Sequence, residues 1–166
     1  MSKQFQEVPE KIGYYIAGFT DGEGSFNVSF RPRNDYKLPW KISLSFNISQ
    51  KDRSILELFK NYLQCGTLRN RKDGVVYYEV TNLNDLVEKI IPFFERYDFL
   101  SAKKIRDFKK FKQIAKIISS QEHLKEGGIR KILEIRSDMN NGGNRKYKDS
   151  IILEKLIKSK SSETIR

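Results

Sequence analysis

The sequence predicts an α+β fold in which helices pack on one face of an antiparallel sheet. Apolar residues recur at helical spacing in some segments and alternate with polar residues in others, and these segments follow one another in the order α-β-β-α-β-β-α. The chain has 166 residues, of which 38% are hydrophobic and 12% aromatic, which favours a folded protein with a proper core despite 32% charged residues. We therefore expect one domain over residues 1–166.

The first helix is expected over residues 9–22. Proline suits the first turn of a helix because its fixed φ is helical and its missing N–H would have no partner there, so the helix begins near Pro9. One side carries an apolar stripe of Ile12, Ile16 and Phe19. The other side carries the small residues Ala17, Gly18 and Gly22. This second stripe allows another helix to approach closely.

Asp21 and Glu23 lie at the C-terminal end of this helix, where glycines stop it. That end is the negative end of the helix dipole, so placing two carboxylates there has an electrostatic cost. On spacing alone, two solvated acids at the end of a glycine-terminated helix are as good an interpretation as a functional site.

Residues 16–24, Ile-Ala-Gly-Phe-Thr-Asp-Gly-Glu-Gly, resemble the nine-residue signature of the LAGLIDADG homing endonucleases. One copy in a chain of this length resembles the homodimeric branch of that family. The resemblance implies an αββαββα core whose antiparallel sheet forms a DNA-binding saddle. It also implies that the motif helices of two subunits pack together through Ala17, Gly18, Asp21 and Gly22.

By the same resemblance, Glu23 binds a divalent metal ion, Mg²⁺ or Mn²⁺, together with the backbone carbonyl oxygen of Gly22. The family usually has Asp where this chain has Glu23, and both side chains are hard oxygen ligands. Asp21 is expected to cap or brace the helix end instead of binding metal.

The formal net charge of +11 points to a polyanionic partner. Residues 1–102 hold 14 Lys and Arg against 13 Asp and Glu, whereas residues 103–166 hold 18 against 8. No apolar run approaches the ~20 residues that span a bilayer, and the N-terminus lacks the apolar core of a signal peptide. We expect a soluble, intracellular protein with no membrane partner, in an organelle or in a bacterial or archaeal cytoplasm. One cysteine and one histidine exclude an internal disulfide and a zinc cluster.

Four strands are expected, at residues 26–31, 41–49, 66–72 and 75–81. A helix that Asp52 or Ser54 caps, and that runs through Gln64, separates the two hairpins. One face of the sheet is apolar and the other carries short polar, basic and tyrosine side chains, which suit the donor and acceptor patterns of base edges in the major groove. The residues expected to contact DNA there are Asn27, Ser29, Arg31, Arg33, Lys41, Ser43, Ser45, Asn47, Arg69, Arg71, Tyr77 and Glu79.

The C-terminal part, residues 101–160, is expected to be helical and basic. Asn82 caps the helix before it, in which Pro92 predicts a kink or a break. Further helices are expected from Ser101, over residues 121–139 with an interruption or a new start at Gly127-Gly128, and over residues 149–158. The basic cluster of Arg145, Lys146 and Lys148 is expected to contact phosphates, so affinity for nucleic acid should fall with salt.

Further catalytic residues follow from position within the family. Gln50, after the second strand, resembles the residue that orients water, and Arg53 is the nearest match to an accompanying basic residue, although its position is offset. Lys103 and Lys104 both fit the lysine that completes the family's site, and Lys103 is favoured. In most proteins, glutamines at strand ends and lysines at helix starts are simply solvated.

The leading interpretation is a site-specific homing endonuclease of the intron-encoded kind. It would be a homodimer that cleaves both strands of a long pseudo-palindromic double-stranded DNA target by metal-assisted phosphodiester hydrolysis. The alternative is an RNA splicing maturase, with intron RNA as a partner, or a non-cleaving DNA-binding protein on the same fold. A purely structural dimerisation domain is disfavoured because the predicted sheet face carries so many short polar side chains.

Overall fold

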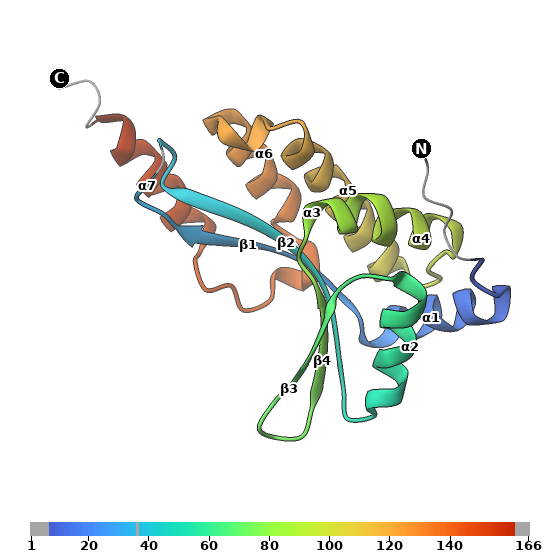
Figure 1. Ribbon diagram of the computed structural model, residues 1–166. Coiled ribbons are helices and arrows are strands. Elements are labelled where there is room, and N and C mark those ends of the chain that lie inside the picture. Colours follow the sequence, from blue (N-terminus) through green and yellow to red (C-terminus); the bar gives the residue numbers. More distant parts are fainter. Residues whose placement is uncertain (1–6, 36, 162–166) are drawn as a thin grey trace. The chain divides into compact units, whose positions relative to one another are not determined.

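The helices and strands follow one another as α1-β1-β2-α2-β3-β4 and then continue as helices (Figure 1). The structure is a computed structural model that describes residues 7–35 and 37–161, with the backbone alone for residues 160 and 161. The chain divides into two compact units, Met1–Phe26 with Ser45–Arg106 and Asn27–Leu44 with Asp107–Arg166. The expected α+β class is confirmed, whereas the expectation of one domain stays a prediction.

A four-stranded antiparallel sheet has the strand order β1-β2-β4-β3. Its strands are β1 (Ser25–Pro32), β2 (Trp40–Gln50), β3 (Thr67–Asn70) and β4 (Val76–Val80). Tyr78 of β4 lies opposite Ile48 of β2 on one side and opposite Leu68 of β3 on the other. The two inner strands, β2 and β4, therefore supply most of the buried surface of the sheet.

The two strands of the second hairpin, β3 and β4, are shorter than the expected ranges 66–72 and 75–81. Its turn takes up residues 71 to 75, with Arg71 N donating to the carbonyl of Val75 at 2.8 Å. Gly74 has a φ of +79°, which glycine adopts without the strain that a side chain would bring. The tight turn predicted from Asp73-Gly74 is thus present, and it shortens both strands.

Aromatic side chains form the core of the first unit. Phe26 of β1 stacks on Phe46 of β2 with ring centroids 5.1 Å apart, and Phe94 lies 5.4 Å from Phe46. The helices α1 (Glu10–Glu23) and α2 (Arg53–Leu63) contribute Ile16 and Phe59, which are fully buried. Burial of this much apolar surface is the main stabilising contribution to the unit.

The helix α2 begins and ends where the sequence predicts. Asp52 caps it by accepting a hydrogen bond from Ser54 N at 2.9 Å, and Gln64 ends it in the left-handed conformation, with φ of 51°. Cys65 follows and is buried, and the Tyr78 hydroxyl donates to its carbonyl oxygen at 3.1 Å. Burial raises the pKa of the Cys65 thiol to about 11, so this thiol stays protonated and belongs to the core.

The helix continues through Pro92, so of the two outcomes that the sequence predicts, a kink or a break, the break does not occur. Asn82 caps α3 (Leu83–Asp85) by accepting from Asp85 N at 3.2 Å, and a π-helical segment, η1 (Leu86–Ile90), leads directly into α4 (Ile91–Arg96). The N–H of Ile91 donates to the carbonyl of Leu86, five residues earlier. A proline lacks an N–H and collides with the carbonyl four residues before it, and the wider π turn relieves both problems.

The second unit contains most of the C-terminal helices. They are α5 (Ala102–Ser119), whose first turn belongs to the first unit, and then η2 (Glu122–Leu124), α6 (Glu126–Arg136), η3 (Met139–Gly142) and α7 (Asp149–Ser161). The expected helix over residues 121–139 is interrupted at Lys125, and both glycines lie inside the first turn of α6. A side chain at Gly128 would overlap the carbonyl of Glu122, which explains the glycine there. In the described part of the chain no helix has both the length and the apolar character needed to cross a membrane.

Candidate active site and nucleic-acid interface

Asp21 joins the end of α1 to the start of α5. Its carboxylate accepts hydrogen bonds from Leu100 N at 3.1 Å, from Ser101 N at 2.9 Å and from the Ser101 hydroxyl. Burial raises the pKa of Asp21, but the bonds from Ser101 and Leu100 and the charge of Lys104 outweigh burial and lower this pKa below its ordinary value. Asp21 thus braces the helix end, as predicted, and stays ionised at neutral pH.

Glu23 lies at the same end of α1 and is exposed. Among the residues that the structure describes, no side chain pairs with its carboxylate. Gly22 beside it is also exposed, and the last carbonyls of a helix have no amide partner further along that helix. The end of α1 therefore presents an exposed carboxylate, that of Glu23, next to an exposed glycine, Gly22.

Lys104, and not the favoured Lys103, is the lysine held at this end of α1. The side chain of Lys104 is buried, with 6% of its surface exposed, and its ammonium donates to the carbonyl of Gly24. Lys103 is exposed on a neighbouring side of the same helical turn. Because successive residues of a helix are about 100° apart around its axis, only one of two adjacent lysines can face α1.

Gln50 and Arg53 lie together at the turn between β2 and α2. Gln50 ends β2, and its side-chain oxygen accepts from Lys51 N at 3.0 Å. Arg53 opens α2, pairs with Glu57 at 2.7 Å and donates to the Asn70 side chain at 2.9 Å. Arg53 thereby ties the start of α2 to the end of β3, a contact that the sequence did not indicate.

The small-residue stripe of α1 differs from the predicted one. Ala17 is 1% exposed and faces the core with Ile16 and Thr20, so the prediction that it packs against a partner helix is wrong for this side of α1. Gly18 and Gly22 do lie on the exposed side, and nothing lies within 4 Å of a Cβ built on either. Tyr14, which is 54% exposed, continues that line at a spacing of four residues.

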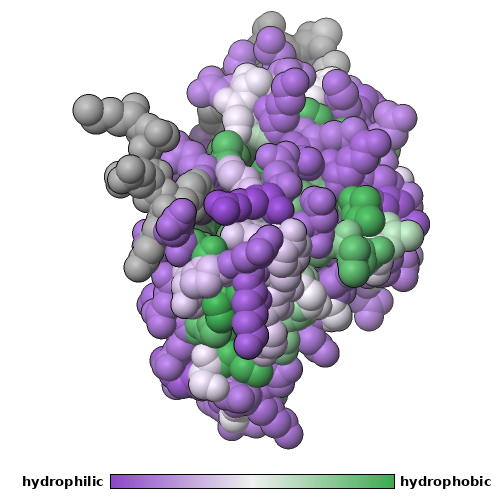
Figure 2. Space-filling view, turned by 90° about the vertical axis from the view of Figure 1, so that its right-hand side faces the viewer, coloured by the Kyte–Doolittle hydropathy of each residue, from purple (hydrophilic) through white to green (hydrophobic). Residues whose placement is uncertain are grey.

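Figure 2 views the molecule from the side on which α1 is drawn in Figure 1. Hydrophilic residues cover most of this face, and hydrophobic residues form separate patches among them. Among the described residues of the first unit, the large exposed apolar side chains are Tyr14, Tyr15, Leu100 and Ile105. Leu100 is 91% exposed, and its backbone N–H bonds to Asp21 at the C-terminal end of α1.

Polar residues of the first unit form rows across β2, β4 and β3, as predicted. Asn47 lies opposite Glu79, and Tyr77 lies opposite Arg69. Arg69 also pairs with Glu79 at 3.4 Å, while Arg71 pairs with Asp73 at 3.1 Å in the turn. Ser45, Asn47, Tyr77 and Glu79 are half-buried, and Arg69 and Arg71 are exposed.

The β1–β2 hairpin of the second unit carries the other predicted contacts. Ser29, Arg31 and Lys41 are exposed, and Asn27 and Ser43 are half-buried. The Ser29 hydroxyl donates to the carbonyl of Ser43 at 3.4 Å. Arg33 makes two bonds of 3.0 Å to Asp35, so its guanidinium fork is already paired and has to leave Asp35 before it can bind a base or a phosphate.

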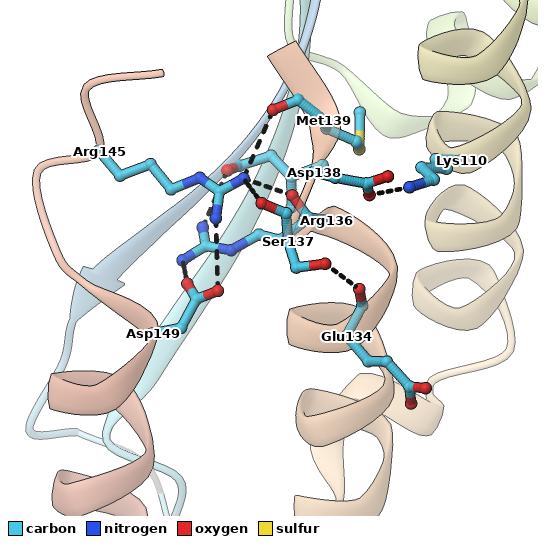
Figure 3. A network of polar contacts seen from close by, with 9 residues as sticks. Lys110, Glu134, Arg136, Ser137, Asp138, Met139, Arg145 and Asp149 are labelled. Carbon is cyan, nitrogen blue, oxygen red and sulfur yellow. Dashed lines mark hydrogen bonds and ion pairs between the residues drawn. The ribbon is translucent and has the colours of Figure 1, made fainter. Parts of the chain in front are cut away.

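Arg145 has a structural role that differs from the predicted phosphate contact. Its guanidinium donates to the carbonyl oxygens of Arg136, Ser137 and Met139 at the end of α6 and pairs with Asp149 at 3.3 Å (Figure 3). Arginine commonly satisfies the last carbonyls of a helix in this way. Lys146 and Lys148 are exposed and remain the candidates for phosphate contacts.

Arg136 is the buried centre of the same network. Its guanidinium donates to the carbonyl of Val28 in β1 at 3.1 Å, pairs with Asp149 at 2.5 Å and lies 4.3 Å from the centre of the Phe30 ring. Asn140, nearby in sequence, donates to the Asn27 side chain at 3.3 Å. The C-terminal helices therefore hold β1, the strand whose outer row is predicted to contact DNA.

Replacing Arg136 by methionine is expected to lower the free energy of unfolding by about 2–4 kcal/mol, because Asp149 and the Val28 carbonyl lose a buried partner. Chemical denaturation measures the change. Lys158→Met is the matched control, since Lys158 pairs with Glu154 at 2.6 Å on an exposed surface and its loss should cost at most about 0.5 kcal/mol. Equal losses of unfolding free energy in the two variants would contradict a stabilising contribution from Arg136.

The model of the LAGLIDADG endonuclease family matches residues 16–115, from the motif in α1 through most of α5. The chain belongs to the LAGLIDADG endonuclease family.

Individual relatives agree with that assignment. A probable intron-encoded endonuclease 2 of Neurospora crassa is 36% identical over 132 residues, which cover 76% of this chain and 27% of the relative. The homing endonuclease I-ApeII of Aeropyrum pernix is 27% identical, with 87% of both chains covered. The solved structure of the archaeal intron-encoded homing endonuclease I-Vdi141I complexed with DNA has a TM-score of 0.81 and 32% identity, covering 91% of this chain and 97% of that one. The chain spans 27% and 24% of two Neurospora relatives, so those are much longer proteins.

Proposed function

We propose that the chain is a site-specific endonuclease that acts as a homodimer and cleaves both strands of a pseudo-palindromic DNA target. The observation that carries the proposal is the end of α1, where Glu23 has an exposed side chain and the next residue, Gly24, accepts a hydrogen bond from the buried Lys104 ammonium. One chain supplies one such end, and its exposed side presents Gly18 and Gly22. The likeness to an intron-encoded homing endonuclease complexed with DNA supports the same substrate.

The oxygen atoms at the end of α1 fit a magnesium or manganese ion. Glu23 offers a carboxylate and Gly22 a carbonyl oxygen, both of which are hard ligands. Among the residues described, no three or more His, Cys, Asp or Glu side chains gather closely enough to hold a metal ion. A single copy therefore offers an incomplete set of protein ligands, and two copies of Glu23 across a twofold axis would supply the carboxylate pair. Once bound, the ion would activate water and stabilise charge on the leaving oxygen.

The remaining residues act on charge and orientation. The Lys104 ammonium is fixed in advance by the Gly24 carbonyl, and a preorganised cation of this kind stabilises the charge that grows on a phosphate under attack. Gln50 would orient water through its side-chain amide. Arg53 would add positive charge, although its bonds to Glu57 and Asn70 limit its reach. Lys103, being exposed, would contact the DNA backbone only electrostatically.

A cleavage selection on randomised double-stranded DNA tests the proposal directly, with Mg²⁺, Ca²⁺ and EDTA compared. We expect enriched cut sites that are roughly palindromic and that appear with Mg²⁺ and not with EDTA. Binding in Mg²⁺ without any cutting would overturn the enzyme and favour a DNA-binding protein. Tighter binding of structured RNA than of DNA in the same buffer would favour a maturase.

Homodimer formation has its own test in Gly18→Leu. Nothing lies within 4 Å of a Cβ at Gly18, so leucine fits the single chain and should raise its helix stability by about 0.5–1 kcal/mol. The same side chain would separate two helices that meet at their glycines, so size-exclusion chromatography with light scattering should report a monomer and cleavage should be lost. Gly127→Leu, at an equally open position of α6, should remain dimeric. A Gly18→Leu protein that dimerises and cuts would contradict this interface.

A further inference from the structure

Ser101 connects the two helices that carry the candidate catalytic groups. Its hydroxyl donates to the Asp21 carboxylate at the end of α1 and accepts from Lys104 N, at 3.3 Å, in the first turn of α5. Its own backbone N–H donates to Asp21 at 2.9 Å. Ser101 precedes Ala102, the first residue of α5, and a serine that accepts from the third residue of a helix is an N-cap. The same hydroxyl thus caps one helix and is bound to the end of another.

We propose that Ser101 is a positioning residue, whose bond to Asp21 sets the first turn of α5 against the end of α1 and so holds the Lys104 ammonium beside the metal-binding residues. The part of this inference that concerns catalysis rests on the proposed endonuclease function. The part that concerns the placement of Lys104 does not.

Lys104 is held through both its backbone and its side chain. Its backbone N–H bonds to the Ser101 hydroxyl, and its side-chain ammonium bonds to the carbonyl of Gly24, the residue directly after Glu23. Burial of an ammonium is costly unless its environment satisfies it, so the position of Lys104 depends on these partners staying in place. Removal of the Ser101 hydroxyl takes away the N-cap that fixes the first turn of α5. The hydrogen bond from the Lys104 ammonium to the Gly24 carbonyl then depends on a helix start that is no longer fixed.

Electrostatics favours the same arrangement. A carboxylate at the C-terminal end of α1 meets the negative end of that helix dipole, which is unfavourable. The same Asp21 carboxylate lies at the N-terminal end of α5, where the exposed N–H groups of Leu100 and Ser101 bind it. The second interaction offsets the first only while the two helix ends stay together. Ser101 donates two of the three hydrogen bonds that Asp21 accepts there, one from its backbone and one from its side chain, and so contributes most to keeping the two helix ends together.

The test compares Ser101→Ala with Ser101→Thr, which keeps the hydroxyl, and with Ser120→Ala. Ser120 is a matched control because its hydroxyl also bonds to a carboxylate, that of Glu122, at 3.0 Å, outside the site. Single-turnover cleavage at saturating DNA in Mg²⁺ is measured beside DNA binding in Ca²⁺. Since small displacements of a catalytic group cost up to about 100-fold, Ser101→Ala should cut about 10- to 100-fold more slowly. Its DNA affinity should stay within about 3-fold, because no base or phosphate contact is removed.

Ser101→Thr should regain most of the lost rate, and Ser120→Ala should cut like the unchanged protein. Loss of rate in step with loss of binding, or no rescue by threonine, would reduce Ser101 to a general stabiliser and overturn the inference.

A second measurement does not depend on cleavage. Lysines are acetylated with acetic anhydride in the folded protein, and each site is followed by mass spectrometry. Lys104 is buried and should react more slowly than exposed Lys103 and Lys109. In Ser101→Ala, the acetylation rate of Lys104 should rise about 10-fold while those of Lys103 and Lys109 stay unchanged, in line with loss of a helix cap. Lys104 that stays protected in Ser101→Ala would overturn the inference even if the chain proves not to be a nuclease.

Discussion

Replacing Glu23 by glutamine is expected to reduce DNA cleavage by about 10³-fold or more while DNA binding is retained, since a neutral amide oxygen is a poor ligand for a hard divalent ion. Glu23 is exposed at the end of α1, so the replacement leaves the core untouched. It also removes a negative charge from the negative end of a helix dipole. The melting temperature should therefore not fall, which separates a catalytic loss from a folding defect.

The measurement is a cleavage time course on a target taken from the selection, in Mg²⁺ and then in Mn²⁺, with binding followed in Ca²⁺. Glu10→Gln provides the control, because Glu10 is an exposed acid at the opposite end of the same helix. Glu10→Gln should cleave normally. Wild-type cleavage by Glu23→Gln would exclude Glu23 as a metal ligand and with it the metal site proposed at the end of α1.

Much of the fold follows from the sequence because the chain follows local rules. The alternation of polar and apolar residues located all four strands, and the capping residues Asp52 and Asn82 located two helix starts. Pro92 was harder, because a proline within a helical pattern leads equally to a break, a kink or a π turn. The choice depends on whether packing keeps the helix together, and here Leu86 and Ile90 on one side of it are fully buried.

The candidate site was predictable in its residue types and less so in its geometry. The sequence places Ala17 in the small-residue stripe with Gly18 and Gly22, because small residues look alike in a sequence. In the structure Ala17 is buried, as is Gly13, where a Cβ would overlap the Tyr97 ring. Arg145 looked like part of a basic cluster, yet the open carbonyls at the end of α6 bind it first. Contacts between segments far apart in the sequence decided both cases.

The sequence is similarly ambiguous about which of the adjacent lysines, Lys103 or Lys104, faces the end of α1. The position of the helix start decides between them. A serine before a helix is a recognisable N-cap, and the third residue after Ser101 is Lys104. With that register, Lys104 faces the Gly24 carbonyl and Lys103 faces outwards. The sequence predicts a helix from Ser101, but the choice between the lysines also requires knowing that Ser101 is the N-cap and not the first residue of the helix.

The two lysines should accordingly behave very differently when each is replaced by methionine. Lys104→Met should slow single-turnover cleavage by about 10²- to 10³-fold, because a preorganised cation beside the reacting phosphate is removed. Lys103→Met should change the rate by less than about 3-fold and should only weaken binding slightly at low salt, as loss of one exposed charge does. Methionine has a similar length and no charge, so it can fill the space of buried Lys104 without leaving a cavity.

Measuring both rates at saturating DNA, together with the thermal stability of each variant, decides between the two positions. The stability of Lys104→Met should fall by about 1–3 kcal/mol, because the Gly24 carbonyl loses its buried donor and the Asp21 carboxylate loses a nearby positive charge. The rates are compared at a temperature at which both variants are fully folded, so that unfolding does not contribute to a lowered rate. If Lys103→Met instead loses cleavage and Lys104→Met keeps it, the exposed lysine must move onto the DNA during catalysis, and the buried ammonium would serve only to join α5 to α1.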